Sequence, residues 1–334
     1  MLAGTLHTLT IDSQVLRDNP LGDPWRRELP VYLPPGHTAY GLPVILVLSG
    51  FSSTGAMQLR GTPWEPSLPE RFERLLSDGR AAPAALAFPD AFTRWGGSQY
   101  MNSDGTGRYA DHVLHELLPA VEERFGVGGS RARRGVAGKS SGGFGALHLA
   151  LESPGTFAAV ASHAGDCAFE LCFRPDFPKL LAQLDRHGSL EAFAAAFERA
   201  PKKTSALLDA MNILAMSAVY SPDRAAPLGI ALPFEPRTGR LRPEVWARWL
   251  EHDPVERARR EGRRLADFAL VYVDAGRRDE YRLQYGARQL VEALAEQGVA
   301  VQHEEFDDGH MGTGYRYDVS LPLLTRALAP SGGA

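Results

Sequence analysis

Short apolar runs alternate with longer helical patterns along most of this chain. Runs typical of buried strands occupy residues 43–48, 84–88, 134–137, 157–162, 268–273 and 299–304, and helical patterns occupy 109–125, 143–152 and 285–297. Parallel strands are buried on both faces and need helical crossovers, so this alternation predicts a mostly parallel central sheet flanked by helices. Residues 5–35 precede this rhythm and predict antiparallel edge strands.

Residues 166–265 interrupt the alternation. Segments such as LEAFAAAFERA and SALLDAMNILAMSAVY have helical patterns, and no convincing buried strand lies among them. A helical insertion of this length between two strands of one sheet predicts a cap or lid, with residues 1–165 and 266–334 forming the core. The alternative is a looser group of helices packed on the sheet edge. A chain of 334 residues is long enough for one large α/β domain with such an insertion.

Composition and charge exclude several other classes of protein. Apolar residues make up 44% and charged residues 23% of the chain, which are ordinary values for a globular protein. The net charge of -4 argues against a nucleic-acid partner, because phosphate binding requires clustered Lys and Arg. Cys167 and Cys172 are too few for a disulfide-stabilised fold and too poorly spaced for a zinc site.

The sequence also gives expectations for the location and the assembly of the protein. The opening MLAGTLHTLTIDSQ lacks the pattern of a signal peptide, and no apolar segment is long enough to span a membrane. We therefore expect a cytoplasmic protein that binds neither nucleic acid nor membrane. Exposed apolar faces of the inserted helices would allow a homodimer.

The stretch GVAGKSSGGFG at residues 135–145 is compatible with two unrelated chemistries. A phosphate-binding loop needs a glycine five residues before Gly138, and that position is Arg133. The alternative is Gly-x-Ser-x-Gly, a sharp strand-to-helix turn that exposes a nucleophilic serine, here Ser140 between Gly138 and Gly142. A short apolar strand precedes this turn and a helical pattern follows it, as that geometry requires. We therefore predict Ser140 as a nucleophile.

A serine hydroxyl becomes a good nucleophile when a histidine takes its proton and a carboxylate orients that histidine. Of the histidines that follow Ser140, His310 lies in a loop, DDGHMG, after the last predicted strand, where its side chain can reach over the sheet. Asp274 and Asp279 both lie beyond the end of strand 268–273, where catalytic groups gather. Asp279 has more room to meet His310, but Asp274 stays an alternative. This chemistry needs no metal and no organic cofactor.

Six segments, in this order, carry a resemblance to a known family: RRELPVYLPPG, PVILVLSGFSSTG, YMNSDGTGRYADHVLHELLPAVEERF, GKSSGGFGAL, DAGRRDEY and DDGHMG. The chain resembles the esterase D family of α/β-hydrolases, which includes S-formylglutathione hydrolases, enterochelin esterases, feruloyl esterases and mycolyltransferases. The resemblance covers most of the chain outside residues 166–265. It implies the α/β-hydrolase fold and a serine esterase that cleaves a small-molecule ester through a covalent acyl-enzyme.

The resemblance also implies roles for individual residues. It makes Ser140 the nucleophile and His310 the general base and acid. It favours Asp279 over Asp274, because the family's acid follows a Gly-x-x-Asp step with an aromatic residue shortly after, as in GRRDEY.

Two backbone N–H groups complete the site that the resemblance implies. The segment LSGF matches the family's oxyanion turn and implies that Phe51 supplies one N–H, while Ser141 supplies the other. We further predict substrate contacts from Trp64, Tyr281 and Met311, which lie near the expected active-site loops.

The chain also departs from the family's pattern. S-formylglutathione hydrolases typically carry cysteine where this chain has Ser53, and His and Met where it has Lys139 and Ser141. The alternatives are a thioesterase of that type, an acyltransferase on the same fold, and an inactive hydrolase fold that serves as a binding module. The sequence assigns no role to Lys139.

Overall fold

The computed structural model describes residues 2–329. Met1 and residues 330–334, which belong to the predicted core, lie outside the described residues. Eight strands form the central sheet in the order β1-β2-β4-β3-β9-β10-β11-β12. Their bounds are β1 Thr5–Asp12, β2 Arg26–Leu33, β3 Val44–Leu48, β4 Ala85–Ala87, β9 Arg134–Lys139, β10 Ala159–His163, β11 Leu270–Gly276 and β12 Gln302–Phe306. Two short hairpins, β5 Phe92–Thr93 with β6 Gly96–Gly97 and β7 Asn102–Ser103 with β8 Gly107–Arg108, lie outside this sheet.

The strand directions confirm the mostly parallel sheet. The strands from β4 and β3 to β12 pair in parallel, whereas β2 is antiparallel to both of its neighbours, β1 and β4. Each strand of this parallel part overlaps one of the predicted apolar runs. Of the two antiparallel strands expected near the N-terminus, β1 forms the edge of the sheet and β2 lies inside it.

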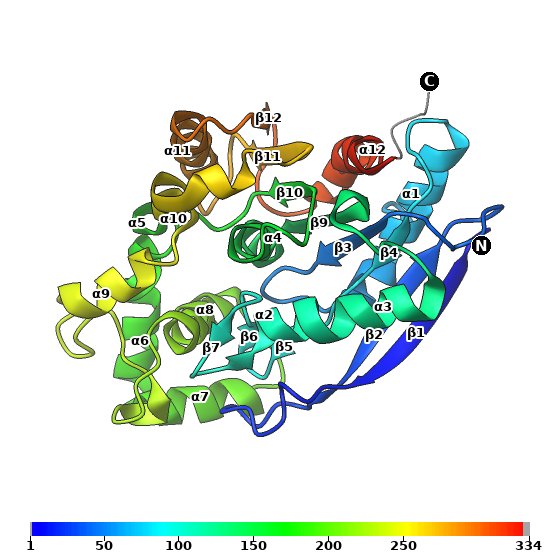
Figure 1. Ribbon diagram of the computed structural model, residues 1–334. Helices are drawn as coiled ribbons and strands as arrows, with labels where there is room; N and C mark the ends of the chain where they lie inside the picture. Colours follow the sequence, from blue (N-terminus) through cyan, green and yellow to red (C-terminus); the bar gives the residue numbers. More distant parts are fainter. Residues whose placement is uncertain (1, 330–334) are drawn as a thin grey trace.

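Helices cover both faces of the sheet because alternate residues of its strands are apolar on either side. In β3, Val44, Leu46 and Leu48 pack in one hydrophobic cluster with α3, α4 and α11, while Ile45 and Val47 pack in another with α1 and α12 (Figure 1). The bounds of these helices are α1 Leu68–Ser77, α3 Leu118–Phe125, α4 Ser141–Glu152, α11 Leu283–Glu296 and α12 Tyr317–Leu328.

The helix expected over residues 109–125 contains a wider turn. It comprises α2 (Tyr109–Asp111), a π-helical segment (His112–Leu117) and α3. Pro119, in the first turn of α3, has no N–H to donate to the carbonyl four residues earlier, which favours an irregular turn just before it.

The inserted helices lie between β10 and β11: α5 Phe169–Cys172, α6 Phe177–His187, α7 Leu190–Arg199, α8 Ser205–Tyr220, α9 Pro243–Leu250 and α10 Pro254–Glu261. Figure 1 shows α6 to α9 gathered at the side of the molecule away from β1. Apolar side chains of these helices and of the segments between them form a separate cluster that reaches Phe144 of α4; it includes Trp249 of α9 and Phe234, which precedes α9. In contrast, α10 packs against α4 and α11, which cover the sheet. The division at 166–265 stays a prediction.

Candidate active site

Ser140 occupies a strained turn between β9 and α4. Its backbone has φ +58° and ψ -126°, a combination that a residue with a side chain seldom adopts. The turn is held because the Ser140 N–H donates to the carbonyl of His163 at 2.9 Å and the Ser140 carbonyl accepts from Phe144 N–H at 2.9 Å. The half-buried side chain is therefore presented above the carboxyl ends of the parallel strands.

The glycines on either side of Ser140 are required by close backbone contacts. A Cβ at Gly138 would lie 2.2 Å from the carbonyl oxygen of Gly142. A Cβ at Gly142 would lie 2.2 Å from the carbonyl oxygen of Leu48 on the neighbouring strand. The Gly-x-Ser-x-Gly spacing is thus a steric condition for this turn.

His310 joins Ser140 to Asp279. Its Nε2 lies 3.0 Å from Ser140 Oγ, and its Nδ1 lies 2.8 Å from Asp279 Oδ2. Ser140 follows β9, and Asp279 and His310 follow β11 and β12, so the carboxyl ends of three parallel strands of one sheet bring the three groups together. Both are buried, at 4% and 5% exposure.

Two residues beside Asp279 hold this pair in place. Glu280 accepts a hydrogen bond from the His310 backbone N–H at 2.7 Å. The Tyr281 backbone N–H donates to Asp279 Oδ1 at 2.8 Å, and the Tyr281 ring contacts the imidazole edge to face at 4.9 Å between centroids. Carboxylate and imidazole are therefore both fixed from the loop that follows β11.

Asp274, the alternative acid, belongs to a different network. Its carboxylate contacts His163 Nδ1 at 2.9 Å, accepts from Tyr272 OH at 2.9 Å and pairs with Arg316 Nε at 2.8 Å. Burial alone would raise the pKa of Asp274, but His163 and Arg316 outweigh burial and lower it. The structure thus places Asp279 against His310 and Asp274 against His163.

The two backbone groups expected to bind an oxyanion both border the same cavity. Neither Phe51 N–H nor Ser141 N–H donates a hydrogen bond to another described residue. The turn that carries Phe51 is fixed because its carbonyl accepts from Gly97 N–H at 2.8 Å and the Ser49 carbonyl accepts from Tyr100 OH at 2.9 Å.

This cavity measures about 510 Å³ and is lined by both the core and the inserted helices. Tyr281 and Met311, two of the predicted substrate contacts, line it, although the Met311 side chain is 71% exposed. Trp64 does not line it. The Thr62 hydroxyl accepts from the Trp64 and Glu65 N–H groups, and this turn leaves the Trp64 side chain 89% exposed.

Lys139 and Asp166 are charged residues of the cavity for which the sequence predicted no role. Lys139 forms no ion pair within residues 2–329, and burial lowers its pKa against the opposing effect of the Asp279 and Glu280 carboxylates. Asp166 is buried at 8% exposure and accepts a hydrogen bond from Ser141 Oγ at 3.2 Å. Asp166 follows the carboxyl end of β10, and that position was the signal that could have identified it.

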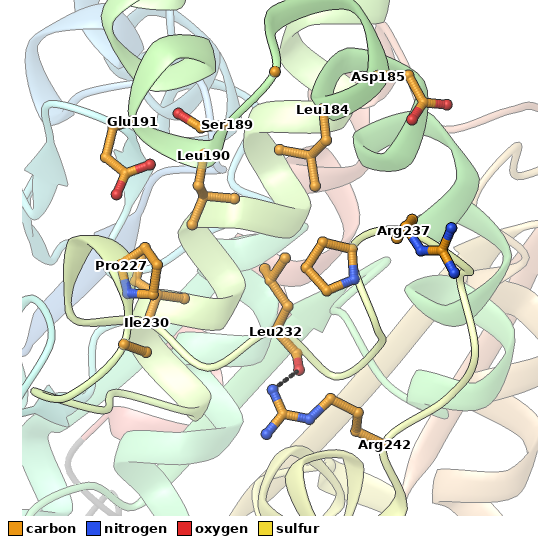
Figure 2. A pocket seen from close by; sticks show the side chains of 13 residues that line it. Leu184, Asp185, Ser189, Leu190, Glu191, Pro227, Ile230, Leu232, Arg237 and Arg242 are labelled. Atoms are coloured by element: carbon orange, nitrogen blue, oxygen red, sulfur yellow. Dashed lines mark hydrogen bonds between the residues drawn. The ribbon is translucent and has the colours of Figure 1, made fainter.

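A second cavity, of about 410 Å³, lies among the inserted helices and shares no lining residue with the first. Figure 2 shows its apolar floor, with Leu184, Leu190 and Leu232, and the Arg242 guanidinium directed at the Leu232 carbonyl. Both cysteines are free and buried. No helix within the described residues is long and apolar enough to cross a membrane.

Three features together define a protein of the α/β-hydrolase fold. They are the order of the strands in the sheet, the strained turn at Ser140, and the hydrogen bonds that link a serine, an imidazole and a carboxylate. The chain belongs to the Putative esterase family, whose sequence profile matches residues 24–320. The resemblance to esterase D-like proteins is thereby confirmed.

Individual relatives match shorter stretches. YbbA, an uncharacterized protein of Bacillus subtilis, is 27% identical over 154 residues, which are 43% of this chain and 58% of YbbA. Esterase Rv1288 of Mycobacterium tuberculosis is 32% identical over 92 residues, which are 27% of this chain and 20% of that protein. The chain thus spans less than two thirds of the length of these curated relatives.

Among solved structures, the fold is similar to that of an S-formylglutathione hydrolase from Agrobacterium tumefaciens. The TM-score is 0.61, and the likeness covers 98% of this chain and 97% of that one at 17% identity. The structural similarity therefore extends over almost the whole length of both chains, although few of their residues are identical.

Proposed function

We propose that this protein is a serine esterase that cleaves a carboxylic ester through a Ser140-His310-Asp279 triad and a covalent acyl-enzyme. The single observation that carries the proposal is His310, which bridges Ser140 Oγ and Asp279 Oδ2 at 3.0 Å and 2.8 Å. Membership of the esterase family supports the class of reaction.

In the acylation step, His310 Nε2 takes the proton of Ser140 as Oγ attacks the ester carbonyl carbon. The resulting imidazolium is stabilised by Asp279, which also keeps Nδ1 protonated and the ring in the productive tautomer. His310 then gives its proton to the departing alkoxide, so that the alcohol leaves and the acyl group remains on Ser140.

In the second step, His310 takes a proton from water, and the hydroxide attacks the acyl carbon. The ester bond to Ser140 breaks, Oγ recovers the proton from His310, and the carboxylic acid is released. In both steps negative charge develops on the carbonyl oxygen. We assign its stabilisation to the N–H groups of Phe51 and Ser141, which are unpaired among the described residues and border the cavity; each such donor contributes about 3 to 4 kcal/mol.

Burst kinetics with 4-nitrophenyl butyrate test this proposal. The wild-type protein should release nitrophenol in a burst equal to the enzyme concentration when acylation outpaces deacylation, and Ser140→Ala should abolish both the burst and turnover. Added alcohol acceptors show whether the acyl group also passes to an alcohol. Steady turnover of the ester by Ser140→Ala at the wild-type rate would contradict the proposal.

A further inference from the structure

Asp166 is a buried carboxylate in the cavity that the proposed triad does not use. It lies three residues after β10, and its side chain borders the same space as Ser140 and His310. One oxygen, Oδ2, accepts two hydrogen bonds, from Gln99 Nε2 at 2.9 Å and from Ser141 Oγ at 3.2 Å. Because both bonds converge on Oδ2, the carboxylate has a fixed orientation.

The two donors are themselves held by other parts of the fold. Ser141 is the first residue of α4, and the Gln99 amide also donates to Tyr220 OH on α8 at 3.1 Å. Gln99 and the adjacent Tyr100 have φ of +55° and +54°, so the backbone that aims this amide is itself constrained. The orientation of Asp166 is therefore set by three separate segments of the chain.

The other oxygen, Oδ1, is free. It accepts no hydrogen bond from the described residues. It is also not fully enclosed by protein atoms. It therefore opens on the cavity that Asp166 lines. No Lys or Arg within residues 2–329 forms an ion pair with this carboxylate.

Asp166 is largely removed from solvent, at 8% exposure, and a partly desolvated carboxylate is less stable than in water unless donors replace the lost water contacts. Burial accordingly raises the pKa of Asp166. A ligand in the cavity that donates a hydrogen bond to Oδ1 would remove this penalty. Asn212 of α8 also lines the cavity, and its amide has no hydrogen-bond partner among the described residues, so the cavity contains a second polar group.

We propose that Asp166 determines substrate specificity: its Oδ1 accepts a hydrogen bond from a donor group, a hydroxyl or an amine N–H, carried by the acyl or the alcohol part of the ester. This inference rests on the proposed esterase function and adds the substrate class, an ester with a hydrogen-bond donor, in place of a simple alkyl ester. Asp166 acts here on the substrate and takes no proton in the reaction.

The asymmetry of the carboxylate gives a sharp prediction for Asp166→Asn. Gln99 and Ser141 both donate toward Oδ2, so the amide oxygen of asparagine takes that place and its NH₂ group replaces Oδ1. The variant then offers a donor to the cavity where the wild type offers an acceptor. The preference for a donor should consequently be lost, because a hydroxyl oxygen and a methoxy oxygen can both accept from this NH₂ group. A merely structural role for Asp166 predicts no such loss.

The test compares kcat/KM for near-isosteric esters that differ at one carbon. In the acyl series, 4-nitrophenyl esters carry a hydroxyl, methyl or methoxy group at carbon 3 of the chain; in the alcohol series, butyrate esters carry the same three groups on the alcohol. In the wild type we expect the hydroxyl ester of one series to exceed its methyl counterpart by about tenfold, the order of one hydrogen bond to a charged group. In Asp166→Asn we expect the methoxy ester to match the hydroxyl ester, and both to exceed the methyl ester of that series.

Asp209→Asn is the matched control, because Asp209 lines the same cavity but is paired with Lys179 at 3.0 Å. It should keep the wild-type order of hydroxyl over methoxy. A wild type without preference for the hydroxyl ester in either series would overturn the proposal, and so would an Asp166→Asn variant that keeps the wild-type order. Should Asp166→Asn fail to fold, the wild-type series alone still decides.

Failure of this inference is distinguishable from failure of the esterase proposal. Plain 4-nitrophenyl butyrate carries no donor, and its Ser140-dependent turnover tests the esterase function independently of Asp166. Turnover of that ester together with equal rates for all three substituents would refute the role of Asp166 alone.

Discussion

At the scale of single residues, two aspartates near the carboxyl end of β11 have different hydrogen-bond partners, and we infer different roles from this difference. Asp279 contacts His310, whereas Asp274 is enclosed by His163, Tyr272 and Arg316. The sequence could not separate them, because both were predicted beyond strand 268–273. In the structure β11 runs to Gly276, so Asp274 lies inside the strand and only Asp279 lies in the loop that reaches the imidazole. Ser140 and His310 could be predicted from the sequence, because a turn motif identifies Ser140 and a position in the loop after the last strand identifies His310.

Asp279→Asn should lower kcat toward 4-nitrophenyl butyrate by about 10³- to 10⁴-fold, because asparagine favours the wrong tautomer of His310. Asp274→Asn should keep kcat within about tenfold but lower the free energy of unfolding by about 3 kcal/mol, because Arg316 loses a buried partner. Steady-state kinetics and urea unfolding of both variants check this pair. The reverse ranking of kcat would refute the assignment of the acid.

The lowered pKa of Asp274 also gives a pH dependence of stability. A carboxyl whose pKa is lower in the folded state stabilises the protein above its unfolded pKa, and this contribution disappears as pH falls through the folded pKa. The difference in unfolding free energy between wild type and Asp274→Asn should therefore be full at pH 7 and shrink below about pH 4. Urea titrations at several pH values measure it; a difference that grows on acidification would contradict the ion-pair account.

At the scale of elements, the turn between β9 and α4 depends on close packing of backbone against backbone. The strands around it were predictable, because runs such as Val44–Leu48 are continuously apolar and buried on both faces. The position of Asp166 after β10 could be predicted, but its orientation could not, because that orientation depends on Gln99 and Tyr220, which are distant in sequence.

Gly142→Ala tests the steric account of this turn. The added methyl group would meet the Leu48 carbonyl at 2.2 Å, so we expect a loss of at least about 3 kcal/mol in unfolding free energy, together with loss of activity. Gly155→Ala is the matched control, since a Cβ at Gly155 meets nothing within 4 Å, and its stability should change by less than about 0.5 kcal/mol. Equal unfolding midpoints for the two variants would show that the glycine at 142 is dispensable.

At the scale of the whole molecule, the inserted helices and the sheet share contacts that should make them unfold together. The cluster around Trp249 includes Phe144 of α4, and Tyr220 of α8 is bonded through Gln99 to Asp166. We expect tryptophan fluorescence, which reports partly on Trp246 and Trp249, and far-ultraviolet circular dichroism to give coincident urea transitions. A fluorescence transition that precedes the loss of circular dichroism would mean that the inserted helices form an independent unit.

The central claim is that His310 activates Ser140, and the site of covalent labelling by a fluorophosphonate tests it most directly. Ser140 Oγ of the wild-type protein should attack the phosphorus and displace fluoride, which leaves one phosphonyl group on the protein. Peptide mass mapping should locate this group on Ser140. Ser140→Ala should not be labelled, and His310→Ala should react about 10³-fold more slowly. An unlabelled wild type, or an adduct on another residue that persists in Ser140→Ala, would contradict the account.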